Sequence, residues 1–211
     1  MPNINVCSSK LGPLVSVLIS GTVRESQMPG VKAGEEVKVS FLAEPTAIVR
    51  NIVGQGIVYD GISPYKVCQE DFSVSFSSGF TGHFLKPPPP GPLAVSGTQG
   101  VPPGGLWFAL MKERVIYDGA WVSTESSDGT VGVPLDMHDS LATYGGVFNV
   151  ELDRFALPSQ KITEAVGTYD KSVLVKADLN IWKDWAANYV IKADFDKMTI
   201  AEAPSIQSQD A

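Results

Sequence analysis

Apolar and polar residues alternate at every second position along several separate stretches of the chain. The clearest are residues 36–41 (EVKVSF), 71–76 (DFSVSF) and 147–153 (VFNVELD). Because successive side chains of a β-strand point to opposite sides, each stretch predicts a strand with one buried face and one solvated face. Such strands are typical of antiparallel sheets, whereas the strands of a buried parallel sheet are apolar on both sides.

The C-terminal part of the chain predicts an antiparallel hairpin. Residues 174–180 (LVKADLN) are nearly repeated at residues 190–196 (VIKADFD), and both copies alternate. The segment between them is short and contains neither Gly nor Pro, so the two strands are expected to pair directly. Trp182 and Trp185 fall in this connection, either at its tip or over an edge of the sheet.

An Asp-Gly pair in the middle of the chain predicts a second hairpin. Residues 114–123 read RVIYDGAWVS, with Asp118 and Gly119 between two strand-like runs. A two-residue type I′ turn needs positive φ at both central residues, which Asp-Gly tolerates well. The sequence therefore predicts that Tyr117 lies opposite Ala120 across this turn.

The fold expected from these patterns is a single all-β domain over residues 1–211. We expect an antiparallel β-sandwich or jelly roll of about eight to ten strands, with a closed, calycin-like β-barrel as the alternative. Residues 77–105 are rich in Pro and Gly and are expected to form a surface loop, because consecutive prolines cannot join a hydrogen-bonded ladder. Residues from about 202 to 211 are expected to form a flexible C-terminal tail. The aromatic residues expected in the core are Trp107, Phe108, Trp121 and Phe148.

Composition and charge narrow the classes of partner. Hydrophobic residues make up 44% and charged residues 18% of the 211 residues, as in globular chains. The net charge of −7, with only 16 Lys and Arg, disfavours binding to nucleic acid or to an anionic membrane surface. No apolar run is long enough for membrane insertion and no signal peptide is recognised, so a soluble, cytoplasmic or virion-associated protein is expected. That expectation favours free thiols at Cys7 and Cys68 over a disulfide bond.

Few residues suggest chemistry. The chain has no C-x-x-C, H-E-x-x-H, Walker A, G-x-S-x-G or EF-hand pattern. Its two histidines are His83 and His138, and His138 is flanked by Asp136 and Asp139. An Asp beside a His can raise its basicity or supply a metal ligand. The alternative, which we favour, is a solvated loop whose side chains point in different directions, so no catalytic residue and no metal site is assigned.

Two further sets of residues are candidates for a ligand site or an interface. Glu125 and Asp128 lie among hydroxyl residues at 123–130 (STESSDGT), which can hold calcium or sugar hydroxyls or form an ordinary solvated turn. Trp182 and Trp185, where exposed, can stack on sugar rings or anchor a protein partner. No cofactor other than calcium is indicated.

Three classes of function fit these observations. The lack of a catalytic motif, the acidic composition and the long Pro-rich segment favour a non-enzymatic structural or interaction protein. A virion decoration protein or an assembly subunit is an example, and such a protein binds protein partners or forms an oligomer. The first alternative is a carbohydrate-binding, lectin-like domain. The second is a β-barrel enzyme of the cyclase or isomerase type, acting on an apolar small molecule.

Overall fold

The structure is a computed structural model, and it describes most of the chain. The described residues are 7, 13–47, 62–85, 106–114, 117–124, 133–139, 142, 144–184 and 189–203. Within these ranges, only the backbone is described at residues 47, 62, 113, 114, 117–119 and 121–124.

Twelve β-strands and one turn of 3-10 helix form the regular structure of the described residues. All strand pairings are antiparallel, which confirms the all-β, antiparallel class predicted from the alternating pattern. In chain order the elements are β1 (Val15–Ser26), β2 (Glu36–Ala47), β3 (Ile62–Val67), η2 (Gln69–Asp71), β4 (Ser73–Phe76), β5 (Thr81–Phe84), β6 (Leu106–Arg114), β7 (Tyr117–Thr124), β8 (Val133–Asp136), β9 (Tyr144–Leu152), β10 (Gly167–Asp170), β11 (Leu174–Lys183) and β12 (Tyr189–Glu202).

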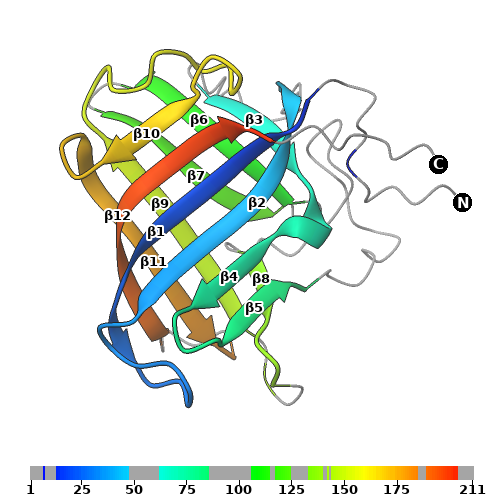
Figure 1. Ribbon diagram of the computed structural model, residues 1–211, viewed down its shortest axis with the longest axis vertical. Coiled ribbons are helices and arrows are strands. Elements are labelled where there is room, and N and C mark those ends of the chain that lie inside the picture. The colour runs from blue at the N-terminus through cyan, green and yellow to red at the C-terminus, as the bar shows by residue number, and fades with distance from the viewer. Residues whose placement is uncertain are drawn as a thin grey trace, which may run out of the picture.

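Eight strands close into a barrel in the order β1-β12-β11-β9-β7-β6-β3-β2, with β2 pairing back to β1. Figure 1 shows β10, β12, β1, β2 and β4 side by side on the near wall. The predicted C-terminal hairpin is confirmed, because β11 and β12 are antiparallel neighbours with Ile181 opposite Ile191. The architecture is the barrel that was the alternative, and the sandwich is wrong. Alternation is the same in both architectures, so only the pairing of β1 with β2, which removes the sheet edges, distinguishes them.

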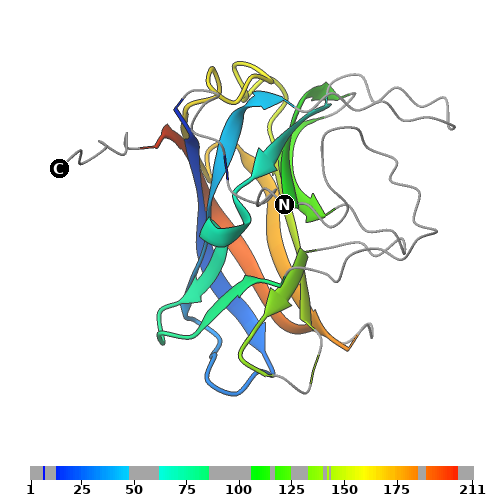
Figure 2. The ribbon, with the colours of Figure 1, turned by 90° about the vertical axis from the view of Figure 1, so that its right-hand side faces the viewer.

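One wall of the barrel is divided into an upper section (β3, β6 and β7) and a lower section (β4, β5 and β8). The start of β2 pairs with β4, and its end pairs with β3, where Ala43 lies opposite Val67. The start of β9 pairs with β8, and its later residues pair with β7. A second ring of eight strands, β1-β12-β11-β9-β8-β5-β4-β2, therefore closes below the first. Figure 2 shows β3 above β4 and β5 on this wall.

Four phenylalanines fill the middle of the barrel. The ring centroid of Phe41 (β2) lies 6.0 Å from that of Phe72 and 5.3 Å from that of Phe108 (β6). The ring of Phe148 (β9) meets Phe72 edge-on at 5.7 Å. All four side chains are at most 2% exposed. Because Phe72 lies between η2 and β4, this cluster joins the two sections of the divided wall through the apolar core.

Strand β6 is buried on both faces. Phe108 packs against Phe41 in the interior, whereas Trp107 and Met111 lie on the opposite, outer face and are still only 5% and 3% exposed. The predicted burial of Trp107, Phe108 and Phe148 is confirmed. The side chain of Trp121 lies outside the described residues.

The connection between β9 and β10 covers the upper end of the barrel. Tyr65 (β3) donates its hydroxyl hydrogen to the carbonyl of Gln160 at 2.6 Å, and it accepts a hydrogen bond from the amide of Ile162 at 3.0 Å. Leu157 and Ile162 are fully buried below it. Burial raises the pKa of Tyr65, so the hydroxyl stays protonated and holds this connection over the core.

The turn predicted at Asp118-Gly119 is wrong. Both residues lie inside β7, and the residue of β6 opposite Tyr117 is Arg114. The reversal between β6 and β7 therefore precedes Tyr117. Pairing of β7 with β6 on one edge and β9 on the other overrides the local preference of Asp-Gly for a turn.

Part of the segment predicted as a loop over residues 77–105 is a strand. Thr81–Phe84 form β5, because they pair with β4 on one side and with β8 on the other. Residues 86–105 lie outside the described residues. At the C-terminus β12 extends to Glu202, and residues 204–211 of the predicted tail are likewise outside the described part.

The two cysteines form a disulfide bond, so the prediction of free thiols is wrong. The Cα atoms of Cys7 and Cys68 are 5.3 Å apart, a usual separation for a disulfide. Cys68 follows β3 directly, is fully buried, and donates its amide hydrogen to the carbonyl of Leu42 at 2.9 Å. The prediction depended on the cysteine count and the N-terminal sequence, neither of which shows that positions 61 residues apart meet at the end of β3.

Candidate binding surface

Asp136 and His138 lie where β8 leaves the lower section. Asp136 is the last residue of β8 and pairs with His83 of β5. Its Oδ1 accepts a hydrogen bond from the backbone amide of His138 at 2.9 Å, and His138 has φ 59°. The His138 ring then lies 6.3 Å from the His83 ring between centroids, with Nε2 3.4 Å from the hydroxyl of Thr81. The fold thus brings together the two histidines of the chain, which sequence reasoning considered separately.

Asp139 belongs to a second polar group, with Tyr144 at the start of β9 and Lys183 at the end of β11. Its Oδ2 accepts hydrogen bonds from the Tyr144 hydroxyl at 3.0 Å and from Lys183 Nζ at 3.2 Å. Burial raises the pKa of Tyr144, and the hydrogen bond to Asp139 raises the pKa of Lys183. Both groups keep their protons at neutral pH, so neither is prepared to act as a base or a nucleophile.

Of the four other candidate residues, only Trp182 is described by the structure. Trp182 lies on the outer face of β11 opposite Gly145, and a Cβ at Gly145 would collide with its indole ring. The Trp182 side chain is only 8% exposed, so it offers little of its face to a ligand. Trp185, Glu125 and Asp128 lie outside the described residues.

The outer wall carries a groove that no sequence pattern indicated. Strand β12 pairs with β11 along its first half and with β10 along its second half, so the start of β11 diverges from β12. A register shift between Leu174 and Lys176 makes Val175 a bulge residue. The resulting hollow of about 320 Å³, which we call the outer groove, is lined by Arg24, Lys171, Leu174, Val175, Lys176, Ala177, Asp178, Asp194 and Phe195.

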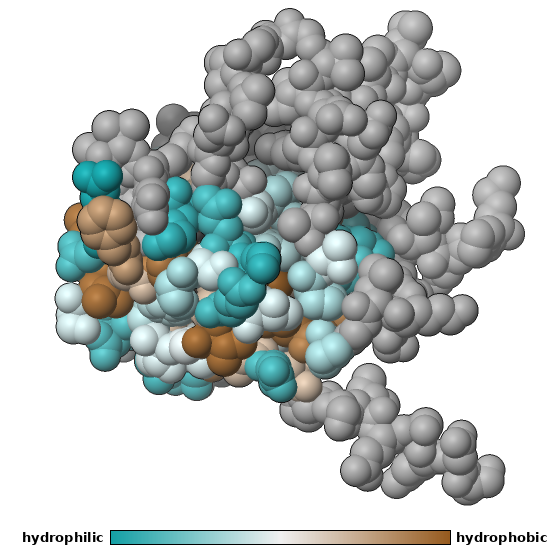
Figure 3. Space-filling model, turned by 90° about the horizontal axis from the view of Figure 1, so that it is seen from above, coloured by the Kyte–Doolittle hydropathy of each residue, from teal (hydrophilic) through white to brown (hydrophobic). Residues whose placement is uncertain are grey.

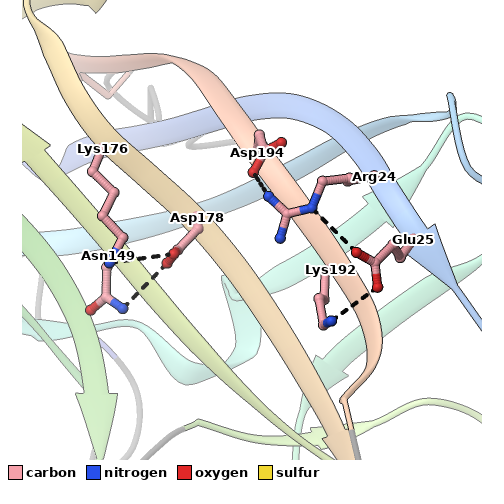
Figure 4. Close-up of polar contacts among 7 residues, drawn as sticks. All are labelled: Arg24, Glu25, Asn149, Lys176, Asp178, Lys192 and Asp194. Carbon is pink, nitrogen blue, oxygen red and sulfur yellow. Dashed lines mark hydrogen bonds and ion pairs between the residues drawn. The ribbon is translucent and has the colours of Figure 1, made fainter.

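The ion pair between Arg24 of β1 and Asp194 of β12 forms one side of the outer groove, and Glu25 and Lys192 extend it beyond the groove (Figure 4). The Arg24 guanidinium contacts Asp194 at 2.6 Å and Glu25 at 3.6 Å, and Lys192 donates to Glu25 at 2.9 Å. The hydrogen bond from Lys192 holds the pKa of Glu25 below its usual value. Glu25 therefore stays charged at neutral pH and compensates the neighbouring cations.

The other side of the outer groove combines an ion pair with a free cation. Lys176 Nζ lies 3.9 Å from Asp178, which also accepts a hydrogen bond from Asn149 at 3.4 Å (Figure 4). Lys171, in the turn between β10 and β11, is exposed and makes no ion pair with another described residue. Its ammonium group is available to a ligand in the groove.

A second hollow of about 510 Å³ shares Lys171 with the outer groove. We call it the polar hollow, because every residue that lines it is polar. Ser20, only 7% exposed, lies among charged side chains of β2, β10 and β12. The lining residues are Ser20, Glu36, Asp170, Lys171, Asp196 and Lys197.

Apolar residues at the upper end of the barrel are exposed singly. Phe155 is 61% and Val166 44% exposed, and the Arg154 guanidinium lies over the Phe155 ring at 4.8 Å. Seen from above, the described surface is mostly hydrophilic or neutral, with separated hydrophobic residues (Figure 3). The upper end of the barrel therefore has the character of an ordinary solvated surface, and the outer groove is the better candidate for a binding surface.

The described part of the chain contains neither a preformed metal site nor a helix that could cross a membrane. No three His, Cys, Asp or Glu side chains there are arranged as a ready-made metal site. No helix among the same residues has the length and hydropathy needed to cross a membrane.

Comparison with known proteins gives no relative for this chain. No protein-family model, no curated protein and no solved structure matches it.

Proposed function

We propose that this protein is a non-enzymatic interaction protein that binds a protein partner through the outer groove. The observation that carries the proposal is Val175, which the β11 bulge exposes to 62% beside Lys171 and a set of compensated ion pairs. An apolar side chain surrounded by polar groups is the usual composition of a protein interface, where the apolar contact supplies affinity and the rim excludes water.

The interior of the barrel is less suited than the outer groove to hold a ligand or substrate. Phe41, Phe72, Phe108 and Phe148 pack against one another across its middle, where a barrel enzyme would place its substrate. Catalytic groups usually have pKa values moved toward the working pH. The Lys183 and Tyr144 pKa values are instead raised, which disfavours the reactive forms of both groups at neutral pH.

The charged residues of the outer groove favour a partner with its own complementary charges. Arg24 and Lys176 are each paired with a carboxylate, so a partner meets alternating charges rather than a single-sign field. Lys171 is the exception, and it favours a carboxylate on the partner next to the apolar side chain that covers Val175. Such patterns contribute more to specificity and association rate than to affinity.

Site-specific photo-cross-linking tests this proposal. A photo-reactive amino acid replaces Val175 in one variant and Val166, at the upper end, in a control. The proposal predicts that only the variant labelled at position 175 forms a discrete cross-linked product with a protein of native extract. Adding Lys171→Glu should abolish this product. Adding Lys32→Glu, the same charge change at an exposed site away from the groove, should leave the product unchanged. Cross-linking to a second copy of the chain would identify self-assembly as the interaction. Equal products at positions 175 and 166 would contradict the proposal.

The polar hollow favours carbohydrate as the second candidate ligand. Its hydroxyl, carboxylate and ammonium groups are donors and acceptors suited to sugar hydroxyls, and no apolar side chain lines it. A glycan array probed with the wild-type chain and with Lys171→Ala tests this candidate. Saturable binding to one glycan class that Lys171→Ala weakens would support it, whereas unaffected or absent binding would leave only the protein partner.

The disulfide bond supports a location outside a reducing compartment. Disulfides form and persist in secreted, periplasmic or virion-surface proteins and are rare in the cytosol. We therefore propose that Cys7 and Cys68 are oxidised where the protein works. Thiol alkylation of native extract without reductant, followed by intact-mass measurement, tests this: an unlabelled chain is expected, and a doubly labelled chain would indicate a reducing compartment.

A further inference from the structure

Strand β11 has a free edge at its start. Residues 174–177 lie beside β9 on one side, whereas pairing of β11 with β12 begins only at Asp178. Strands inside a sheet exchange hydrogen bonds along both edges. The N–H and C=O groups of this stretch that point away from β9 therefore have no partner strand among the described residues. All four residues of the stretch line the outer groove, so the groove follows the free edge.

Strand β12 is open at the corresponding point. It pairs with β11 as far as Asp194 and with β10 from Lys197 onward. The residues between them, Phe195 and Asp196, therefore face no described strand on this side. Residues 171–177 span the same interval and curve away from β12, which leaves the hollow of about 320 Å³. The outer groove is thus a local gap in the sheet with main-chain groups along its sides.

We propose that the outer groove receives an extended, acidic segment of the partner, which pairs through its main chain with residues 174–177 of β11. This inference rests on the proposed function, because it names the kind of partner that the same groove holds. An added strand gains main-chain hydrogen bonds from a free edge, and its alternate side chains supply specificity. At about 3.3 Å per residue, the free edge accommodates roughly 13 Å of extended chain.

The charges around the outer groove favour an acidic segment. The lining residues carry three positive and two negative side chains, in a chain whose net charge is −7. The two carboxylates compensate Arg24 and Lys176. The remaining cation is Lys171, which is exposed and forms no ion pair within the described part of the chain. A carboxylate on the added segment would compensate it.

A second copy of this chain is a poorer occupant of the edge than an acidic segment. Lysine side chains at a free edge are one means by which natural proteins prevent identical strands from pairing. Lys171 and Lys176 are both exposed beside the β11 edge. Two such edges brought together would place like charges near each other, whereas an acidic segment places opposite charges there.

Titration of the full chain with short synthetic peptides, followed by amide hydrogen exchange, tests this inference. The probes are an acidic peptide of alternating Glu and Val, a basic peptide with Lys in place of Glu, and the acidic peptide with every backbone amide N-methylated. We expect the acidic peptide to bind with a Kd of about 1 mM or lower and to slow exchange within residues 174–177. The basic peptide should bind at least about threefold more weakly. The N-methylated peptide cannot donate main-chain hydrogen bonds and should bind at least about tenfold more weakly.

Charge variants of the chain locate the interaction. Lys171→Glu should weaken binding of the acidic peptide and strengthen binding of the basic peptide, by about threefold each. Lys32→Glu, at an exposed position away from the groove, should change neither affinity. Because both positions are exposed, unchanged melting temperatures will show that the two variants are folded.

Three results would overturn the pairing of strands. The first is equal affinity for the acidic and the N-methylated peptide, since only side chains would then enter the groove. The second is no binding of the acidic peptide at about 1 mM, and the third is slowed exchange only outside residues 174–177. Photo-cross-linking at position 175 tests the groove separately. A cross-linked protein there without peptide binding would keep the proposed function and reject strand pairing, whereas peptide binding without a cross-linked protein would keep the strand-binding edge and reject the proposed function.

Discussion

The upper and lower sections close the same barrel with differently patterned strands. Strand β6 of the upper section is apolar over residues 106–111 and buried on both faces. Strand β4 of the lower section alternates, with Val74 and Phe76 buried inside and Ser73 and Ser75 half-buried outside. Strand β6 is therefore covered on both faces, whereas the outer face of β4 is partly solvated.

This difference explains where polar chemistry accumulates. A strand with a solvated outer face can present single ionisable side chains without a large desolvation cost, whereas the half-buried Lys66 of β3 is paired with Glu44 at 3.0 Å. The lower section presents His83 and Asp136 on paired positions, whereas the corresponding outer position of β6 holds Trp107. The same reasoning applies to the outer groove, which lies on the wall shared by both rings.

The largest loss of stability is expected where the two sections meet. Phe72→Ala removes a fully buried ring in contact with Phe41 and Phe148, so it should lower the free energy of unfolding by about 3–5 kcal/mol. Urea unfolding measures this loss. Phe155→Ala, at a site 61% exposed, is the control and should change stability by less than ~1 kcal/mol. A small effect of Phe72→Ala would mean that the sections are not joined through the core.

Substitutions on the outer faces of the two sections should change the free energy of unfolding by very different amounts. Trp107→Ala should cost roughly 3–4 kcal/mol, because this outer-face side chain is only 5% exposed. Ser75→Val, on the outer face of β4, should stay within about 0.5 kcal/mol of wild type. Similar losses for both variants in chemical unfolding would remove the distinction between an internal and a solvated section.

Removal of the disulfide bond should lower the free energy of unfolding by an intermediate amount. Cys7→Ser leaves the described barrel strands intact but removes the covalent link between residue 7 and the end of β3, and should cost about 2–4 kcal/mol. Reduction of the wild-type chain should lower the urea midpoint to that of Cys7→Ser. Wild-type stability that is unchanged by reductant would show that the bond does not constrain the unfolded chain.

A smaller loss of stability is expected from substitution of Gly145, which lies where β9 pairs with β8 of the lower section. Gly145→Ala places a methyl group against the Trp182 indole and should cost about 1–3 kcal/mol. Gly167→Ala is the matched control, since its Cβ would make only ordinary contacts, at 3.8 Å or more, with Tyr169. A shift in Trp fluorescence with Gly145→Ala alone would confirm that the indole moves.

The smallest effect concerns pH. Hydrogen bonds from Lys192, Lys161 and Ser172 lower the pKa values of Glu25, Glu164 and Asp170 respectively. Carboxylates with lowered folded-state pKa values stabilise the fold above their unfolded pKa values, and this contribution is lost as the pH falls through the folded values. The urea midpoint should thus decline slightly below about pH 4, and less steeply in Glu164→Gln. A midpoint that rises on acidification would contradict this sign.

Sequence patterns predicted which face of each strand is buried better than they predicted which strands pair with one another. The alternation in residues 36–41 and 71–76 correctly placed apolar side chains inside, because that periodicity is local. Which strands pair is decided by contacts distant in sequence, so neither the closure of β1 on β2 nor the meeting of Cys7 with Cys68 was predicted. The unbroken apolar run of β6 did carry a signal for burial on both faces.

The candidate sites depended even more on distant pairing. The local sequence around His138 offered Asp136 and Asp139 as its polar neighbours, whereas β5–β8 pairing adds His83 and leaves Asp139 to Tyr144 and Lys183. The outer groove results from a bulge at Val175 and from β10 taking part of the β12 edge. Neither a bulge nor a shared edge has a reliable signature in a single sequence.

Strands β2 and β9 each pair with both sections of the divided wall, and nuclear Overhauser contacts between backbone protons test this central feature directly. We predict contacts of β2 with both β3 (Ala43 with Val67) and β4 (Val39 with Val74), and of β9 with both β7 (Val150 with Ala120) and β8 (Gly146 with Val133). Observation of all four sets would establish two rings that share five strands. Contacts of β2 or β9 with only one section would contradict the divided barrel and the histidine pairing that depends on it.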